Sequence, residues 1–449
     1  MFSFKEYLPF YKRNLVLAAP VMVAQAGQVT VQFADNIMVG HLGTTQFAGV
    51  AFANTIFLIG MVFAICFTQG LTPHAGQNYG KGEYGNVAKY FFNSFVLDFI
   101  MVLVVMVLLF STIPFMYNMG QDEEIVEYAI TYLNINTISL LPGVMFFAIR
   151  NFSEGIGITK YAMYITIAAN AINIFLNWVL IYGELGFPSL GVAGAAYATL
   201  ISRILSFISF AILIMTINPY KSYFKYLTKD VLEMKKMKEL LATSIPVGVQ
   251  GLVEVTAFSL SGIMSGWFGK VALAGHQIAN TMSSTSFMIA QGIGAAATIR
   301  VSHQFGAKDY VAAKMAGKAA IHMSVAFMGM AGIIYIIFRH QLPLIFTSDP
   351  QVIDMAATLL IFGSAFQVFD AAQLSGIASL RALNDVKIPL LFSFLAFYCV
   401  CLPLGYVCSK LLGLGPIGVW TGLILGLMFA AILYLTRFNK LVNRYITER

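Results

Sequence analysis

Long apolar stretches separated by short polar segments recur along the whole chain of 449 residues. A helix needs about 20 apolar residues to cross a lipid bilayer, and stretches of that length predict twelve transmembrane helices. They lie near residues 15–36, 50–70, 90–114, 126–148, 160–183, 191–215, 240–262, 275–298, 319–338, 352–375, 388–409 and 417–436. We therefore expect an all-α membrane protein with six spans in each half.

The two halves carry the same backbone-shaping residues in the same register. The segment Pro20–Tyr84 returns without a gap as Pro246–Tyr310, 226 residues later. The matched positions are mostly Pro, Gly and small residues, which set kinks, turns and close backbone approaches. Further along, Lys160 matches Lys387 with an offset of 227. An internal duplication of this kind is a common way to build a transporter.

This duplication predicts three parts of the chain. Residues 1–217 form an N-terminal six-helix lobe, residues 218–239 a cytoplasmic connector, and residues 240–449 a C-terminal six-helix lobe. Within the connector, the run of charged residues at 221–238 is interpreted as solvated. The two lobes are expected to be pseudo-symmetric six-helix bundles.

Basic residues are distributed unevenly among the loops. Only 10% of the residues are charged, against roughly 25% in soluble domains. Of the 27 Lys and Arg residues, 23 lie in the tails and in alternate loops, at 1–13, 81–89, 150–160, 221–238, 300–318, 381–387 and 437–449. Cytoplasmic loops carry such an excess, so we expect both termini in the cytoplasm. The same distribution argues against a nucleic-acid partner, despite a net charge of +7.

Several kinds of chemistry have no signal in this sequence. The chain has no G-x-x-x-x-G-K-[ST] phosphate-binding loop, and its connectors are too short for an ATPase domain. The four Cys and six His residues show no metal-binding spacing. A pump of this kind is therefore expected to use an ion gradient and to need no cofactor beyond a coupling ion.

Among the acidic residues within the predicted spans, Asp35, Asp98, Glu254 and Asp370 stand out. A charge at the bilayer centre costs roughly 2.5–3.5 kcal/mol on insertion scales, so each needs a partner, a water-filled cavity or a proton. Asp98 has no patterned polar neighbours, which favours a structural role. Arg203 is the one basic residue within a predicted span; we expect it to pair with an acid or a helix end, or to reach the surface, without a role in transport.

The first predicted helix carries a polar stripe. Gln25, Gln28, Gln32 and Asp35 are spaced 3, 4 and 3 residues apart, which places them on one helix face. A lipid-facing stripe would be unfavourable, so this face must meet other polar helices or an aqueous cavity. The glutamines fit either interhelical hydrogen bonding or a binding site, whereas the charge of Asp35 favours a functional role.

The fifth predicted helix offers a matching amide stripe. Asn170, Asn173 and Asn177 are spaced 3 and 4 residues apart, and Thr199 on the next helix can join them. Together with Asp35 they predict a site for a small cation or a proton, because oxygen ligands suit hard cations. A polar network between helices remains the alternative for the asparagines.

The second half places its acids differently. Glu254 follows Gln250 by one turn, and Asp370 lies between Gln367 and Gln373 with spacings of 3 and 3. The repeat register does not align these acids with the acid of the first helix. This predicts a one-acid site in the first lobe and a two-acid site in the second. Two adjacent carboxylates can hold a shared proton, or a monovalent cation in its place.

Several motifs resemble a known transporter family. They are Ala34–Gly43 (ADNIMVGHLG), Gln69-Gly70 leading to Gln77–Gly80 (QNYG), Gly251–Glu254 (GLVE) and Phe369-Asp370. In combination they make the chain similar to multidrug and toxic compound extrusion (MATE) transporters, in the bacterial NorM-like branch. The resemblance covers nearly the whole chain.

The resemblance implies two six-helix bundles facing each other across a central cleft. It further implies a monomeric multi-pass protein of the bacterial cytoplasmic (inner) membrane, which exports small cationic, lipophilic drugs or metabolites in exchange for Na⁺ or H⁺. By position, Glu254 and Asp370 match the acids of the second-lobe cation site, and Asp35 matches the first-lobe acid.

The remaining site residues follow from the same stripes and from the resemblance. The expected supporting ligands are Asn173, Asn177, Thr199, Gln32, Gln250 and Gln367, and the expected substrate cleft is lined by Gln25, Gln28, Asn54, Asn280 and Phe366. Phe366 stands where the family often has a Tyr, one turn before the tenth-helix acid. A hydroxyl ligand is lost there, so the choice between Na⁺ and H⁺ stays open.

A cation-coupled multidrug exporter is the predicted function. A flippase for lipids or lipid-linked oligosaccharides, with related architecture, is the alternative; it would be expected to carry several basic residues in its cavity. An intramembrane enzyme would need a His- or Ser-based constellation at membrane depth, and the sequence shows none.

Overall fold

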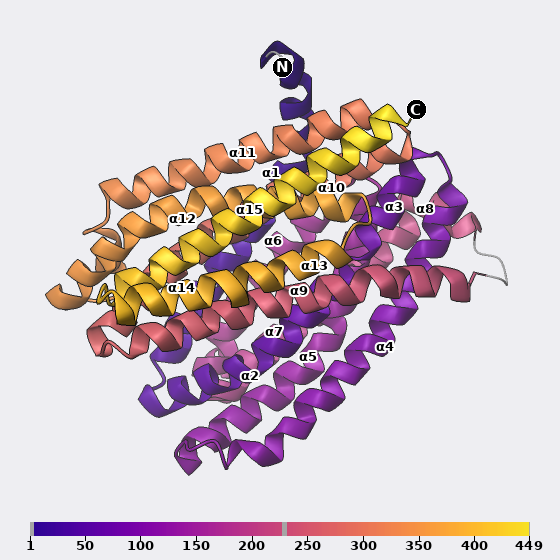
Figure 1. Cartoon of the computed structure of the whole chain (residues 1–449). Coiled ribbons are helices and arrows are strands. Elements are labelled where there is room, and N and C mark those ends of the chain that lie inside the picture. The colour runs from indigo at the N-terminus through magenta and orange to yellow at the C-terminus, as the bar shows by residue number, and fades with distance from the viewer. Residues whose placement is uncertain (1–3, 227–230, 449) are drawn as a thin grey trace. The chain divides into compact units, whose positions relative to one another are not determined.

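The computed structural model describes residues 4–226 and 231–448. These residues are helical along almost their whole length (Figure 1). Two of the basic residues counted above, Lys229 and Arg449, and part of the predicted connector lie outside the described residues.

The helices of the first half are α1 (Phe4–Gly40), α2 (Thr44–Thr68), α3 (Leu71–Gly80), α4 (Tyr84–Met116), α5 (Glu123–Gly155), α6 (Lys160–Tyr182) and α7 (Gly191–Thr216). Those of the second half are α9 (Met234–Gly266), α10 (Lys270–Gly306), α11 (Tyr310–Ile337), α12 (Pro350–Ala382), α13 (Lys387–Phe394), α14 (Leu402–Tyr406) and α15 (Pro416–Thr447). Short helical segments complete the described chain: η1 (Glu184–Gly186), α8 (Tyr220–Tyr223), η2 (Phe224–Tyr226), η3 (Leu342–Ile345), η4 (Leu395–Cys401) and η5 (Val407–Leu411).

Eleven helices of the described chain are long and apolar enough to cross a membrane. In this count α2 and α3 act as one span, Thr44–Gly80, and the segments from α13 to η5 act as another, Lys387–Leu411. The twelfth predicted stretch lies in α10, which has 37 residues but is interrupted by polar side chains such as Ser283 and Ser286. The predicted stretches therefore all fall on helices.

The repeat seen in the sequence is also a repeat of helix boundaries. The helices α5 and α12 both have 33 residues, and their first residues are 227 positions apart. The turns that follow α1 and α9 each contain a glycine with positive φ, 139° at Gly43 and 99° at Gly269. Side chains other than hydrogen are strained in this conformation, so glycine is required at both turns. The predicted pseudo-symmetry of the two halves is confirmed.

The chain divides into two compact units whose boundaries differ from the predicted lobes. We call residues 23–78 and 82–248 the N-unit, and residues 1–22, 79–81 and 249–449 the C-unit. The start of α1 packs within the C-unit, where the Asn14 amide donates a hydrogen bond to the Ala316 carbonyl at 3.0 Å. Conversely, the connector and the first half of α9 belong to the N-unit.

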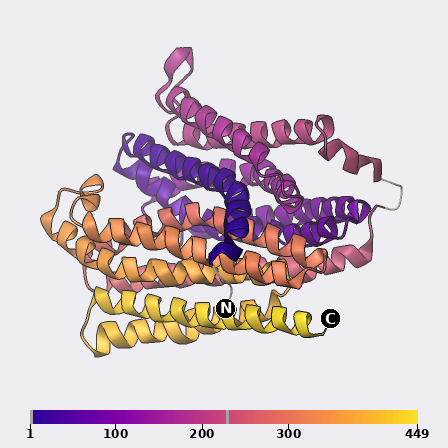
Figure 2. The same cartoon turned by 90° about the horizontal axis from the view of Figure 1, so that it is seen from above.

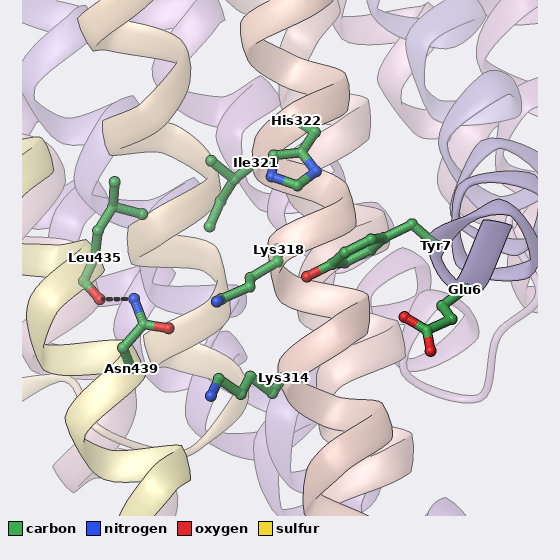
Figure 3. Close-up of a pocket in the computed structure, with 8 residues that line it drawn as sticks. All are labelled: Glu6, Tyr7, Lys314, Lys318, Ile321, His322, Leu435 and Asn439. Carbon is green, nitrogen blue, oxygen red and sulfur yellow. Dashed lines mark hydrogen bonds between the residues drawn. The ribbon is translucent and has the colours of Figure 1, made fainter. Parts of the chain in front are cut away.

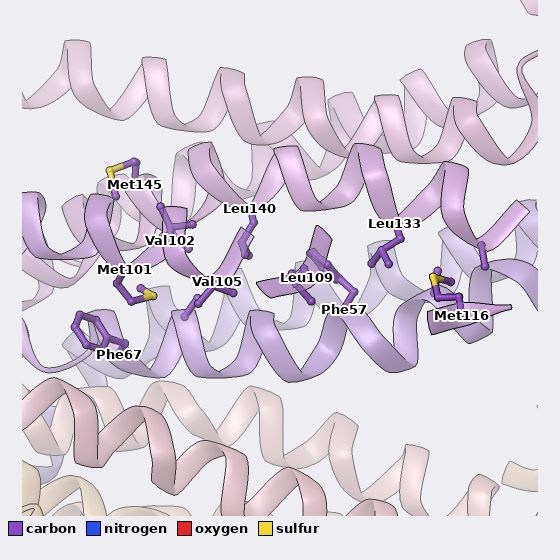
Figure 4. Packing of buried hydrophobic residues seen from close by; sticks show 14 of the residues in the cluster. Phe57, Phe67, Met101, Val102, Val105, Leu109, Met116, Leu133, Leu140 and Met145 are labelled. Carbon is purple, nitrogen blue, oxygen red and sulfur yellow. The ribbon is translucent and has the colours of Figure 1, made fainter. Parts of the chain in front are cut away.

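Each unit is built around one central helix. In the N-unit α5 packs against α2, α4 and α7, and an apolar cluster that includes Phe57, Val105 and Leu140 fills the space between helices (Figure 4). In the C-unit α12 packs against α10, α11 and α15, which run alongside it in both views (Figures 1 and 2). Lipid tails are as apolar as these side chains, so it is van der Waals packing between the helices that stabilises each unit in the membrane.

Part of the connector folds onto the N-unit, although the sequence predicted a solvated charge run. Tyr220 is fully buried and Tyr223 is 5% exposed. The Tyr220 hydroxyl lies 2.5 Å from the Ser153 hydroxyl of α5, and burial raises the pKa of Tyr220 above its usual value. Two aromatic rings packed under the charged residues therefore hold the start of the connector against α5.

An acidic residue holds the other end of the connector. Glu233 accepts hydrogen bonds from Lys89 of α4 at 2.6 Å and from Lys236 at 2.7 Å. Hydrogen bonds from Lys236 and then Lys89 lower the pKa of the Glu233 carboxyl to about 2. This ion-pair triad fastens the beginning of α9 to α4.

Candidate functional site

The N-unit brings Asp35 of α1 together with the amide stripe of α6. The Asn177 side-chain amide donates a hydrogen bond to the Asp35 carboxylate and contacts the Asn173 side-chain oxygen at 3.2 Å. Asn177 is fully buried and Asn173 is 5% exposed. The spacing of four residues along α6 places both amides on the face that meets α1. The structure thus brings together three of the N-unit residues that the sequence grouped, Asp35, Asn173 and Asn177.

A glycine allows α1 and α6 to approach closely at this point. A Cβ atom at Gly27 would lie 2.8 Å from the side-chain nitrogen of Asn170. That nitrogen and the side-chain oxygen of Asn177 are buried without a hydrogen-bond partner among the described residues. Buried polar atoms without partners are uncommon, and of these two residues Asn177 is the one that contacts the Asp35 carboxylate.

A third helix, α5, also contributes polar side chains to this site, and sequence reasoning did not identify them. Tyr132, Asn136 and Ser139 lie on one face of α5, with spacings of 4 and 3 residues. The Asn136 amide donates a hydrogen bond to the Tyr132 carbonyl at 3.2 Å. The side chains of Asn54 and Asn136 lie beside the Tyr132 hydroxyl, which also interacts with the charge of Asp35. The helical spacing of these polar residues was a visible signal, but nothing in the sequence indicated which helix they face.

Arg203 of α7 also belongs to this site. Its Nη1 atom donates a hydrogen bond to the Ser139 hydroxyl at 2.7 Å, and its guanidinium lies 5.7 Å from the ring centroid of Phe57. Arg203 and Asp35 interact electrostatically, without a direct ion pair in the described chain. Arg203 therefore supplies a positive charge to the acid of its own unit, one of the outcomes that the sequence left open.

Two of the predicted N-unit ligands do not join the described cluster. Thr199 donates its hydroxyl to the Ala195 carbonyl of its own helix at 3.1 Å, and Gln32 is exposed. Of the residues expected to line a cleft, Gln25 is buried while Gln28 and Asn54 are half-buried. Helical spacing placed Gln25, Gln28 and Gln32 on one polar face of α1, but the rotation of α1 against its neighbours decides which of these side chains turn inward.

The C-unit brings its two predicted acids within electrostatic range of each other. The side chain of Gln373 lies beside the Glu254 carboxylate of α9, and the charges of Glu254 and Asp370 interact. Asp370 is 2% exposed, and one of its carboxylate oxygens has no hydrogen-bond partner in the described chain. Whether these acids approach each other could not be read from the sequence.

Two further buried oxygens on α12 lack partners. The side-chain oxygens of Gln367 and Gln373 make no hydrogen bond with the described residues, and the Gln367 amide lies 3.5 Å from the Ser283 carbonyl. Together with the unpartnered oxygen of Asp370, they form a row of three acceptors spaced three residues apart. This donor set fits a hard cation or a proton.

An arginine that the sequence assigned to a loop takes part in the C-unit site. Arg381 lies in the last turn of α12. Its Nη2 atom donates to the Gln250 side-chain oxygen at 2.8 Å, and the Gln250 amide donates to the Ser393 hydroxyl at 2.6 Å. Arg381 also acts electrostatically on Glu254. Both the oxygen and the nitrogen of the Gln250 side chain are therefore hydrogen-bonded to protein groups, and Gln250 holds Arg381 in place.

The remaining predicted positions lie outside these acid clusters. Phe366 is 3% exposed, and its ring packs against Phe258 and Trp420 at centroid distances of 5.9 and 5.6 Å. It is a core residue of the C-unit, whereas Asn280 of α10 is half-buried. Asp98 is fully buried in α4 and accepts a hydrogen bond from Ser94 at 3.2 Å.

A model of the MatE family matches the chain twice, at residues 20–179 and 246–407. The two matches start 226 residues apart, at the prolines that open the sequence repeat. Each half of the chain is therefore one copy of the family's unit.

Curated relatives match over nearly the full length. The chain is 30% identical to the multidrug resistance protein NorM of Photobacterium profundum, over 95% of both chains. It is also 30% identical to a probable multidrug resistance protein NorM of Bacillus anthracis, over 99% of this chain and 98% of the relative.

Solved structures show the same fold. An outward-facing multidrug resistance MATE family transporter of the MOP superfamily matches with a TM-score of 0.90 at 20% identity, over 98% of this chain and 97% of that one. A MOP superfamily transporter from Pyrococcus furiosus matches with a TM-score of 0.90 at 21% identity, over 97% and 96%. These matches confirm the predicted all-α fold, and together with the family model they show that the chain belongs to the MatE family of multi-pass multidrug transporters, which are not enzymes.

Proposed function

We propose that this protein exports small cationic, lipophilic compounds across the bacterial cytoplasmic membrane in exchange for Na⁺ or H⁺, by alternating access. The observation that carries the proposal is the C-unit site, where Glu254 and Asp370 lie within electrostatic range of each other. Neither carboxylate is ion-paired with a lysine or arginine in the described chain. Family membership supports efflux of drug-like compounds in general.

The charge balance of this site suits one monovalent cation at a time. Glu254 and Asp370 carry two negative charges when ionised, and Arg381 supplies one positive charge nearby. A net charge of about −1 in a buried place is costly, so binding of one Na⁺ or H⁺ stabilises the site. The unpartnered oxygens of Asp370, Gln367 and Gln373 are the proposed ligands.

Exchange of this cation along its gradient can drive export. When one monovalent coupling ion enters for each monovalent cationic compound exported, no net charge crosses the membrane, and a tenfold gradient of the coupling ion supplies about 1.4 kcal/mol. Each further coupling ion that enters per cycle adds about 2.3 kcal/mol for a membrane potential of 100 mV. Asp35, with the amides of Asn173 and Asn177, is proposed as a second proton or cation site that alternates with the C-unit site.

Ethidium efflux from loaded cells tests the proposal, with external Na⁺ and pH varied separately. We expect efflux that depends on one of the two gradients and is lost in Glu254→Gln and Asp370→Asn. Asp354→Asn is the matched control, because this acid lies on the same helix and its side chain is 79% exposed. Unaltered efflux in both site variants would end the site assignment. Efflux insensitive to both gradients would end the antiport mechanism.

A further inference from the structure

A hollow of about 710 Å³ opens in the C-unit between α1, α11 and α15. It lies at the start of α1, in the first half of α11 and toward the end of α15 (Figure 3). It is remote in sequence from Glu254 and Asp370, and neither the family match nor the proposed transport site gives it a role. Its lining combines positive charge, aromatic rings and apolar surface.

The positive charge comes from two lysines of α11 that lie one turn apart. Lys314 and Lys318 are both half-buried, and each is close enough to sense the charge of the other. Lys314 donates a hydrogen bond to the neutral side chain of Asn443 at 2.6 Å. Neither lysine is ion-paired with a carboxylate in the described chain. Two like charges held in one hollow create a site that an anion would stabilise.

The arrangement of the side chains leaves the lysine ends directed into the hollow. In Figure 3 both lysine side chains point toward α15 and Asn439, while Glu6 lies on the opposite side, on α1. The Asn439 amide already donates to the Leu435 carbonyl at 2.9 Å. The side of the hollow facing α15 is therefore the place for a negatively charged group.

The opposite wall is aromatic. Tyr7 is 8% exposed, stacks on Tyr11 at a centroid distance of 5.9 Å and meets the edge of His322 at 5.4 Å. The Tyr11 hydroxyl lies 2.9 Å from the His322 ring nitrogen. Tyrosines are enriched at the boundary between lipid tails and headgroups, so this wall is suited to that depth.

The position of the hollow along α11 also suits a lipid headgroup. The two lysines precede the apolar stretch of α11 that begins near residue 319, and Ile321 and Leu435 continue the wall toward it. The excess of basic residues in the adjoining loops assigns this end of the helices to the cytoplasm. A lipid of the cytoplasmic leaflet would thus present its headgroup to the lysines and its acyl chains to the apolar wall.

We propose that this hollow binds an anionic glycerophospholipid, with Lys314 and Lys318 on the headgroup phosphate and Ile321 and Leu435 beside the acyl chains. Basic pockets between transmembrane helices at the cytoplasmic side recognise anionic headgroups by this chemistry. The site does not depend on the coupling ion, so it stands or falls separately from the proposed transport mechanism.

Native mass spectrometry of the full-length protein in detergent tests the proposal, with phosphatidylglycerol, phosphatidylcholine or soluble glycerol phosphate added. We expect one retained phosphatidylglycerol and much weaker binding of phosphatidylcholine, which carries the same phosphate but no net charge. Each Lys→Gln change should weaken phosphatidylglycerol binding about fivefold, because a lysine near an anionic lipid contributes about 1 kcal/mol. Lys314→Gln/Lys318→Gln together should therefore give about a 25-fold loss.

Lys440→Gln is the matched control, since Lys440 is exposed on α15 next to Asn439 but does not line the hollow. Equal binding of phosphatidylglycerol by the double variant and the wild type would overturn the site. Equal binding of both lipids would overturn the anionic selectivity, and equally tight glycerol phosphate would indicate a free phosphate as ligand instead of a lipid. If the double variant does not fold, the proposal is still tested by phosphatidylglycerol binding to Lys318→Gln and by the comparison of the two lipids on the wild type.

Discussion

The acid sites of the N-unit and the C-unit share a backbone plan but differ in charge. Asp35 in the N-unit has the positive charge of Arg203 in its surroundings. In the C-unit Arg381 acts on Glu254, and Glu254 interacts in turn with the charge of Asp370. The N-unit cluster is therefore balanced when its acid is ionised, and the C-unit cluster carries one unbalanced negative charge. Duplication preserved the helices, while the ionisable groups changed independently.

The central helices show how this difference arises. With the 227-residue offset that relates α5 to α12, Arg381 occupies the place of Glu154. Glu154 is ion-paired with Arg150 of the same helix at 2.6 Å, and both side chains are less than 9% exposed. The end of α5 thus neutralises its own charge, whereas the end of α12 directs an arginine to Gln250 and Glu254.

The largest expected effect separates the two acid sites directly. Asp370→Asn should reduce coupled efflux at least tenfold, because the remaining charges Glu254 and Arg381 are balanced and no longer require a cation. Asp35→Asn should reduce the efflux rate less, since the C-unit site still binds its ion. Initial rates of ethidium efflux at saturating gradient measure both. An equal loss in the two variants would contradict the proposed difference between the units.

A double-mutant cycle in the N-unit tests whether Arg203 balances Asp35. Asp35→Asn and Arg203→Gln should each lower stability by about 1–3 kcal/mol, because each leaves one half-buried charge without its counterpart. The double variant should lose less than the sum, with a coupling of at least about 0.5 kcal/mol. Thermal unfolding of the purified protein in detergent provides the comparison. Strict additivity would mean that the two charges are independent.

In the C-unit, removal of the arginine should strengthen cation binding. Arg381→Gln leaves two acids without a positive neighbour, so we expect the half-saturating concentration of the coupling ion to fall several-fold. Lys387→Gln serves as the control, because Lys387 is an exposed basic residue at the start of α13. The ion dependence of efflux at fixed membrane potential gives both values. A higher half-saturating concentration would show that Arg381 acts mainly by positioning Gln250.

The smallest expected effect concerns the attachment of the connector to the N-unit. Glu233 has a folded-state pKa of about 2, below its usual value of 4.5, so its ion pairs stabilise the protein above about pH 4.5 and lose this effect as the pH falls toward 2. Glu233→Gln should lower the melting temperature by about 1–3 °C at pH 7, as expected for a partly exposed pair. The difference from wild type should shrink as the pH approaches 3.

Glu448→Gln is the comparison for this experiment, because Glu448 forms an exposed ion pair with Arg444 in the C-unit. It should change the melting temperature less than Glu233→Gln does. A difference at Glu233 that persisted unchanged down to pH 3 would contradict the ion-pair explanation.

Helical periodicity was sufficient to group polar side chains that lie along one helix face. The spacing of Asn173 and Asn177 placed them on one face of α6, and the structure directs that face to Asp35. The same reasoning placed Gln32 on the face of Asp35, and Thr199 was added from the next helix. In the structure Gln32 is exposed and Thr199 bonds to its own helix. Periodicity shows on which side of a helix a residue lies, but it does not show whether that side contacts another helix, lipid or water.

The arginines were beyond sequence reasoning for a different reason. Arg381 lies near a helix end, where a basic residue ordinarily indicates a cytoplasmic loop, and Arg203 had several candidate partners. Long side chains such as these reach across the width of a helix. Their partners, Gln250 and Ser139, are more than sixty residues away in the chain.

The sequence by itself determined the all-helical membrane fold, the repeat of its two halves and the positions of the buried acids, because these depend on apolar length, helical period and the cost of charge in lipid. Tertiary structure alone decided the unit boundaries, the pairing of Glu254 with Asp370 in one cluster and the arginine that each cluster contains. The physical reason is that electrostatic balance depends on distances between side chains on different helices, and those distances are set by how the helices rotate and pack.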